Sequence, residues 1–138
     1  MTTTTTLSVR LESDILAARQ HGREVAEQVG FSGSDLALIA TAISEVARNI
    51  VVHAGGGAIM ISELADGRAG IEIVARDDGP GILDIDLAMQ DGYSTVASLG
   101  LGLPGARRLM DEFTIESQEG HGTTVVMRKW TKTQPAQG

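Results

Sequence analysis

The feature that most constrains this chain is one long amphipathic helix, predicted between residues 34 and 54. Apolar side chains recur in it at intervals of three and four, at Leu36, Ile39, Ile43, Val46 and Ile50. This spacing puts them on one side of a helix, so the helix must pack against another layer. Ser34 or Asp35 is the predicted N-cap, and three glycines at 55–57 end the helix. Because 138 residues are the size of one domain, that domain must supply the covering layer.

The remaining pattern predicts strands mixed with two shorter helices. Strands are expected over residues 5–11, 58–64, 70–75, 113–117 and 123–130. One helix is expected from a cap at Ser13 to Gly30, and another over 104–113. We therefore expect an α/β fold, a two-layer sandwich of one mixed, mainly antiparallel sheet with helices on one face. The domain would cover residues 1–130 and leave a polar tail at 131–138.

Composition limits the partners of this domain. Eleven basic and 18 acidic side chains give a net charge of −7, which repels a phosphate backbone, and two Phe, one Tyr and one Trp cannot form a base-stacking surface. We therefore expect no nucleic-acid partner. The lack of cysteine excludes disulfides, thiolate metal sites and a cysteine nucleophile. Neither a secretory signal nor a long uninterrupted apolar run is seen, so a cytoplasmic protein without membrane contact is expected.

Glu45 and Asn49 form the first pair of residues suited to chemistry. They are four residues apart in the long helix, so they share a face beside the apolar stripe and can look into a cleft. A carboxylate can accept a proton, and an amide oxygen can bind Mg²⁺ together with phosphate oxygens and water. A solvated polar flank of the helix explains the pair equally well.

The second segment, Arg76-Asp77-Asp78-Gly79-Pro80-Gly81, begins where a strand is predicted to end. A carboxylate at Asp77 can accept a hydrogen bond from the exocyclic amine of adenine, and Gly79 and Gly81 let the backbone pass close to a flat base. The same pairs of Asp, Gly and Pro also mark ordinary turns. Taken alone, this segment fits a surface turn better than a binding loop.

A third segment places Gly100, Gly102 and Gly105 just before and inside the last predicted helix. They end an irregular stretch over 76–103, whose length indicates a binding loop, with a lid expected over 92–100. Unpaired N–H groups at the start of a helix attract phosphate oxygens. The first lysine is Lys129, so a Walker-type Gly-Lys motif is absent, and triphosphate charge would be met by backbone N–H groups, Mg²⁺ or an arginine.

The order of these motifs is more specific than any of them alone. Glu-x-x-x-Asn, Asp-x-Gly-x-Gly, Gly-x-Gly and a final Gly122-Thr123 follow one another over residues 35–126, about two thirds of the chain. This arrangement resembles the GHKL, or Bergerat, ATP-binding fold. Within it, residues 42–50, 89–95 and 98–105 are similar to the RsbT-type switch serine kinases of bacterial partner-switching modules.

The resemblance implies a role for each motif residue, with ATP and Mg²⁺ as cofactors. Glu45 would be the general base or would orient the attacking hydroxyl, Asn49 would bind the metal, and Asp77 would recognise adenine. The nucleotide contacts would be completed by Gly79, Gly81, Gly100, Gly102, Gly105 and Thr123.

The family's activity implies a protein substrate. The chain would phosphorylate a serine on a STAS-domain antagonist protein in stress signalling, and would bind a phosphatase or other downstream regulator as a second partner. The alternative is a nucleotide-gated binding module that sequesters a partner and needs no catalysis.

One position departs from the related sporulation anti-sigma kinases, which carry an arginine just before Gly-x-Gly. This chain has Ser98-Leu99 there. The cation that faces the γ-phosphate would then be Arg48, Arg107 or Arg108, unless Mg²⁺ and backbone N–H groups suffice.

Overall fold

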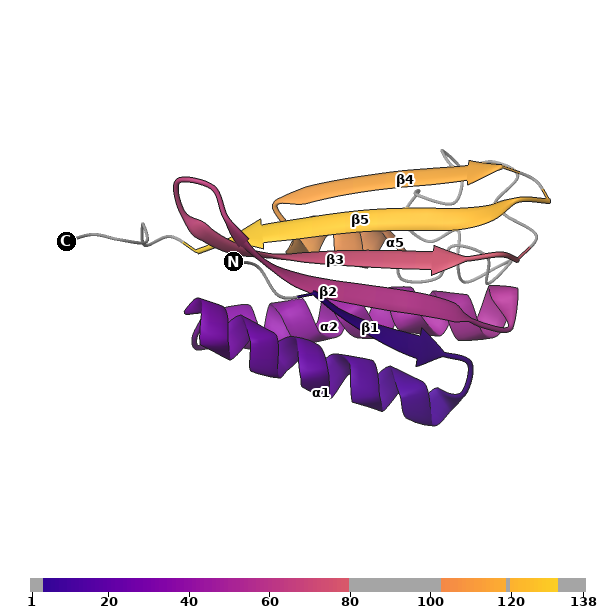
Figure 1. Cartoon of the computed structure of the whole chain (residues 1–138), viewed down its shortest axis with the longest axis horizontal. Coiled ribbons are helices and arrows are strands. Elements are labelled where there is room, and N and C mark those ends of the chain that lie inside the picture. The colour runs from indigo at the N-terminus through magenta and orange to yellow at the C-terminus, as the bar shows by residue number, and fades with distance from the viewer. Residues whose placement is uncertain (1–3, 80–102, 119, 132–138) are drawn as a thin grey trace.

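The computed structural model describes residues 4–79, 103–118 and 120–131. Within them five strands form one sheet in the order β1-β2-β3-β5-β4 (Figure 1). The strands are β1 Thr4–Val9, β2 Gly57–Ala65, β3 Ala69–Asp77, β4 Glu112–Gln118 and β5 Gly122–Trp130. Each described pair of neighbours is antiparallel, so the predicted sheet is confirmed and its parallel component is not seen among these strands.

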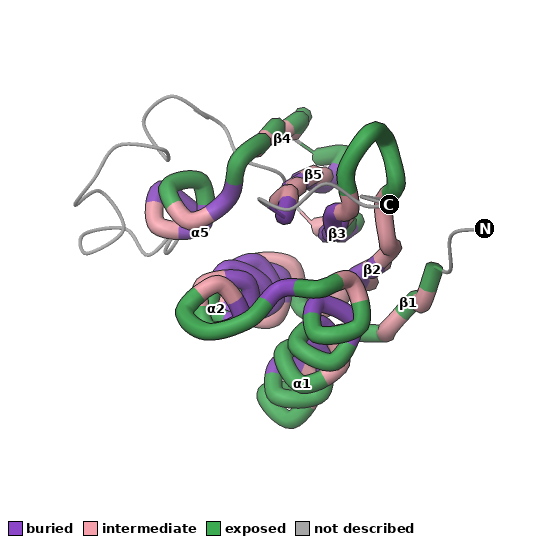
Figure 2. The backbone as a smooth tube through the Cα atoms, turned by 90° about the vertical axis from the view of Figure 1, so that its left-hand side faces the viewer, coloured by how far each residue is buried: buried purple, intermediate pink, exposed green. Residues whose placement is uncertain are grey.

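All described helices lie on the same face of this sheet (Figure 2). They are α1 Glu12–Val29, α2 Ser34–Asn49, the π-helical turn η1 Ile50–Ala54, and α5 Leu103–Leu109. The helix α2 packs against both α1 and α5. The predicted two-layer α/β sandwich is therefore confirmed, and the opposite face of the sheet carries no described helix.

The core forms where alternate strand residues meet the apolar stripe of α2. Ile59 and Ile73 of the sheet are fully buried, as are Ile39 and Ile43 of α2. Burying a side chain of this size stabilises the fold by roughly 1.5–3 kcal/mol. The segment Ser34–Ala54 is also long and apolar enough to cross a membrane by length and composition, but 56% of its apolar window is buried inside the molecule, as in a core helix.

The start of α1 differs from the prediction. The strand ends at Val9, and Leu11 is the N-cap residue of α1, with 66% of its surface exposed. Ser13 does not cap the helix. Instead the Asp14 carboxylate accepts hydrogen bonds of 2.9 Å from the backbone N–H groups of Arg10 and Leu11. These bonds lower the pKa of Asp14. An acceptor three residues inside a helix thus replaces the predicted cap.

Two other helix ends also move. Gly33, rather than Ser34 or Asp35, is the N-cap of α2. The last helix stops at Leu109, and Phe113 belongs to β4, where it pairs with Met127 and packs against the core. The Lys129 ammonium donates a 3.0 Å hydrogen bond to the Leu109 carbonyl, which satisfies an acceptor at the end of α5. The predicted strand from Phe113 is therefore confirmed, whereas the helix expected to continue to residue 113 ends earlier because β4 pairs with β5 from Glu112.

The structure also contains both predicted hairpins and the first residue of the predicted C-terminal tail. The turn at Asp66-Gly67 and the closing hairpin of β4 and β5 are confirmed. Thr131, assigned to the tail by sequence, is buried, and its backbone N–H and hydroxyl both donate to the Ala69 carbonyl oxygen. The rest of the tail and the predicted lid at 92–100 lie outside the described residues.

Candidate functional site

Asp77 is the last residue of β3, and its side chain is buried with 9% of the residue exposed. Its carboxylate accepts a 2.9 Å hydrogen bond from the Gly79 backbone N–H. Burial raises the pKa of Asp77, while hydrogen bonds from the Gly79 and Thr123 backbones and the charge of His53 partly oppose the rise. The hydrogen bond from Gly79 is the local bond of an Asx turn, as the turn interpretation predicts, but the carboxylate is buried and does not lie on the surface.

The backbone is tightly packed around Asp77. A Cβ on Gly79 would lie 2.6 Å from the Ala54 Cβ, and one on Gly57 would overlap the Arg76 carbonyl oxygen. A Cβ on Gly122 would overlap the carbonyl oxygen of Asp77 itself. No side chain fits at these positions unless the strand end moves, so the glycines fix where the carboxylate stands.

Thr123 lies opposite Asp77 in the pairing of β3 with β5, and it is buried. The hydroxyl groups of Ser117 and Thr123 are 2.8 Å apart, and Ser117 donates a 3.0 Å hydrogen bond to the Gly122 carbonyl. The structure thus brings Thr123, which the resemblance assigns to the nucleotide site, beside Asp77. The sequence analysis missed Ser117, although the register of the predicted hairpin would place it across from Thr123.

Asn49 and Glu45 lie one turn apart near the end of α2. Asn49 is 8% exposed, and its Oδ1 is buried without a hydrogen-bond partner among the described residues. Glu45 is half-buried. An unpartnered buried oxygen is costly unless a ligand satisfies it, and an amide oxygen is a ligand that Mg²⁺ accepts. For Asn49, the polar-flank alternative does not agree with this burial.

A π-helical turn, η1, begins directly after Asn49. Such turns are frequent at functional sites, and periodicity in the sequence gives no sign of this one. The turn carries His53, whose Nε2 is also buried without a hydrogen-bond partner in the described part of the chain. It also carries Ala54, which contacts the position of Gly79. The turn therefore links the end of α2 to the loop after Asp77.

The remaining predicted residues are placed less fully. Gly105 is a half-buried residue of α5 with open space at its Cβ position. Arg48 and Arg107 are exposed on α2 and α5. Gly81, Gly100 and Gly102 lie outside the described residues. Within the described ranges, His, Asp and Glu form no group of three or more that could hold a metal. A metal here would thus take most of its ligands from phosphate and water.

The sequence matches a known family over almost its whole length. The profile described as a histidine kinase-like ATPase domain matches residues 7–129. The chain belongs to this family. It is 53% identical over 125 residues to the serine/threonine-protein kinase RsbT of Bacillus subtilis, covering 90% of this chain and 94% of that protein.

Two further relatives are described as anti-sigma F factors. The Bacillus cereus protein is 30% identical, with 82% of each chain covered, and the Caldanaerobacter subterraneus protein is 35% identical, with 70% of this chain and 71% of that protein covered. The predicted resemblance to RsbT-type switch kinases, and with it the class of serine/threonine protein kinase, is confirmed.

Proposed function

We propose that the chain transfers the γ-phosphoryl group of ATP to a serine of a STAS-domain antagonist protein, with Mg²⁺ as the metal. The observation that carries this proposal is that η1 links two buried acceptors: the unpartnered Asn49 Oδ1 directly precedes it, and the loop after Asp77 contacts its other end at Ala54. One acceptor suits an adenine amine and the other a divalent cation.

The base would be held at the end of β3. Asp77 accepts a hydrogen bond from the exocyclic amine of adenine, and Thr123 supports Asp77 from β5. Gly79 and Gly81 keep the backbone close to the base. The high cost of ionising a desolvated carboxylate is offset when it receives an N–H donor, so adenine binding and burial of Asp77 favour each other.

The metal would be held by Asn49, which supplies one amide oxygen. When bound, Mg²⁺ neutralises phosphate charge during transfer. Gly100, Gly102 and Gly105 contribute backbone around the phosphates at the start of α5. Arg48, Arg107 or Arg108 adds positive charge at the γ-phosphate, with Mg²⁺ and backbone N–H groups as the alternative.

Glu45 would act on the protein substrate. It lies one turn before Asn49 on the same helix face, within the same site. Its carboxylate orients the partner's serine hydroxyl and accepts the proton as the serine oxygen bonds to the γ-phosphorus and ADP leaves. Half-burial keeps the carboxylate close to the reaction and still accessible to a docked protein.

The setting proposed for this reaction is a cytoplasmic partner-switching module. The kinase domain spans residues 1–130 together with the buried Thr131, residues 132–138 are the tail, and a phosphatase or other regulator is the second partner. Nucleic acid and membrane take no part.

A second candidate function is sequestration of a partner without catalysis. It is favoured by the relatives described as anti-sigma F factors. Nucleotide would then order the site and would not be consumed.

The proposed activity is tested by incubating the purified chain with γ-labelled ATP, Mg²⁺ and each STAS-domain protein of the same genome. We expect label on one serine of one STAS protein, and no label when that serine is replaced by alanine. If the chain forms a stable complex with one of these proteins but none of them acquires label from ATP, the sequestering function would be favoured.

A further inference from the structure

A hollow lies at the end of the sheet where β3 leads into the nucleotide site, between outer-face residues of β2 and β3 and the end of η1 at Ala54 and Gly55. Side chains alternate along a strand, so Arg76, which precedes the inward-facing Asp77 in β3, belongs to the outer face, and Asp78 follows the end of the strand. In the strand register Arg76 lies across from Ala58 of β2, and Ala58 lies across from Ser8 of β1. On this face β2 therefore has only the small Ala58 side chain between its neighbouring strands β1 and β3.

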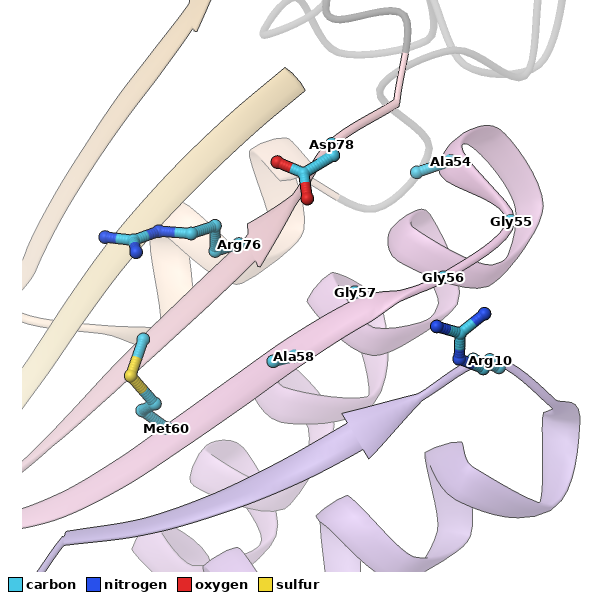
Figure 3. Close-up of a pocket in the computed structure, with 9 residues that line it drawn as sticks. All are labelled: Arg10, Ala54, Gly55, Gly56, Gly57, Ala58, Met60, Arg76 and Asp78. Atoms are coloured by element: carbon cyan, nitrogen blue, oxygen red, sulfur yellow. The ribbon is translucent and has the colours of Figure 1, made fainter. Parts of the chain in front are cut away.

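This hollow has a volume of about 520 Å³. It is lined by Arg10, Ala54, Gly55, Gly56, Gly57, Ala58, Met60, Arg76 and Asp78 (Figure 3). Figure 3 shows Arg10 beyond β1 and Arg76 on β3, with the glycine segment and Ala58 between them. The Arg10 stem lies over Gly56, because a Cβ on that glycine would be 3.1 Å from the Arg10 Cγ. Missing side chains on β2 thus create the space.

The charges in the hollow are unusual for this protein. The chain carries a net charge of −7, yet two arginines line one cavity, and neither forms an ion pair with a described residue. Figure 3 shows the Arg76 side chain extending away from Arg10, so the two guanidinium groups lie apart. Guanidinium groups form their strongest hydrogen bonds with carboxylates and phosphates. Met60 and Ala58 add apolar surface between them, and Asp78 adds one acceptor.

We propose that this cavity docks an acidic segment of a protein partner, with a carboxylate side chain next to an apolar one. The carboxylates meet Arg10 and Arg76, the apolar side chain covers Met60 and Ala58, and a backbone N–H of the segment donates to Asp78. A lone phosphate would leave most of the 520 Å³ unfilled and would lie near the Asp78 carboxylate. Neighbouring strands are about 4.8 Å apart, so a segment over β2 reaches both flanking strands.

The inference rests on the proposed function only in taking the partner to be a protein. Docking takes place on the outer face of the sheet, whereas Asp77 faces the helices from the same strand end. Binding of a peptide can therefore be measured without ATP and without phosphoryl transfer.

The probe is the fluorescein-labelled peptide acetyl-Asp-Leu-Glu-Leu-Asp-amide, and the readout is fluorescence anisotropy with the full chain. We expect saturable binding that weakens with added salt, and none for the matched peptide with Asn and Gln. R10Q and R76Q should each weaken binding about tenfold, the loss of one charge-assisted hydrogen bond. A58L, which fills the hollow without changing charge, should weaken binding at least about as much.

R23Q is the matched control, since Arg23 is an exposed arginine of α1 outside the cavity. It should keep the peptide affinity within about twofold. Circular dichroism and the affinity for Mg·ATP identify variants that remain folded, and A58L and R76Q test the proposal independently if R10Q does not fold. Equal affinity in all folded variants, or no binding to the wild type, would overturn the inference. If inorganic phosphate displaced the labelled peptide at a lower concentration than the unlabelled peptide does, the inference would also be overturned, because the cavity would then be a site for a small anion.

Discussion

Gly122 of β5 packs directly against the backbone carbonyl of Asp77 of β3, so closely that a Cβ on the glycine would overlap that oxygen. Gly122 also has a φ of +86°, a conformation that L side chains rarely adopt. The contact ties the closing hairpin to the residue proposed to recognise adenine. The final Gly-Thr motif therefore has a steric role besides any contact of Thr123 with the nucleotide.

Replacing this glycine should damage both stability and nucleotide binding. G122A is expected to lower the free energy of unfolding by about 2–5 kcal/mol, the sum of a left-handed backbone and an overlap that must be relieved. Gly120 is the matched control, because its φ is +80° and nothing lies within 4 Å of its Cβ position. G120A should cost only about 1–2 kcal/mol and should keep ATP affinity. Equal losses in denaturant titrations of the two variants would contradict the steric role.

Asp77→Asn should abolish or strongly weaken ATP binding while the fold is kept. An amide whose NH₂ faces the adenine amine cannot accept from it, and an unpaired buried polar group costs about 1–3 kcal/mol, or roughly 5- to 150-fold in affinity. Isothermal titration calorimetry with ATP measures the loss. An unchanged affinity would remove Asp77 from the nucleotide site.

In the absence of nucleotide, the difference in stability between D77N and wild type should depend on pH. Burial raises the pKa of Asp77 above its ordinary value of 3.8, so the folded state favours the protonated carboxyl. Its stabilising contribution is complete below 3.8 and is lost as pH rises through the raised pKa. Asn does not titrate, so the stability of D77N relative to wild type should increase between pH 4 and about pH 7. Chemical denaturation across this range would refute the reasoning if the difference decreased instead.

Asn49→Ala should weaken ATP binding far more in Mg²⁺ than in EDTA. The reason is that the Oδ1 of Asn49 is buried without a protein partner in the described structure, and the metal is the ligand proposed to satisfy it. Both affinities are measured on one variant, so a folding defect affects them alike. Equal losses in the two buffers would make Asn49 a structural residue of α2.

Much of the fold could be predicted from the spacing of apolar residues, because both helices and strands bury side chains at regular intervals along the sequence. The stripe from Leu36 to Ile50 predicted α2, and the turn at Asp66-Gly67 predicted the hairpin of β2 and β3. Element ends were less predictable. Asp14 caps α1 through a side chain inside the helix, and Phe113 leaves the helix because β5 offers it a partner. The cap is a local contact that the Ser13 interpretation overlooked, whereas the end of α5 depends on the pairing of β4 with β5.

The site shows a similar division. Asp77 and Thr123 were brought together by the family resemblance alone, and the register of β3 with β5, which the structure supplies, places them opposite each other. The π-helical turn after Asn49 could not be foreseen, because an insertion of this kind leaves the apolar spacing of α2 unchanged. The burial of Asn49 Oδ1 is likewise a tertiary property, since α2 is packed against α1 and α5.

The most direct measurement of the proposed catalytic role compares Glu45→Gln with wild type in phosphoryl transfer to the STAS partner. Glutamine keeps the shape of the side chain but cannot accept the proton, so the rate should fall about 10²- to 10⁴-fold. The affinities for Mg·ATP and for the partner should stay within about twofold of wild type. These affinities are the control, because a folding defect would reduce binding and turnover together. Transfer by E45Q at the wild-type rate, measured in single-turnover experiments with labelled ATP, would contradict the assignment of Glu45 as the catalytic carboxylate.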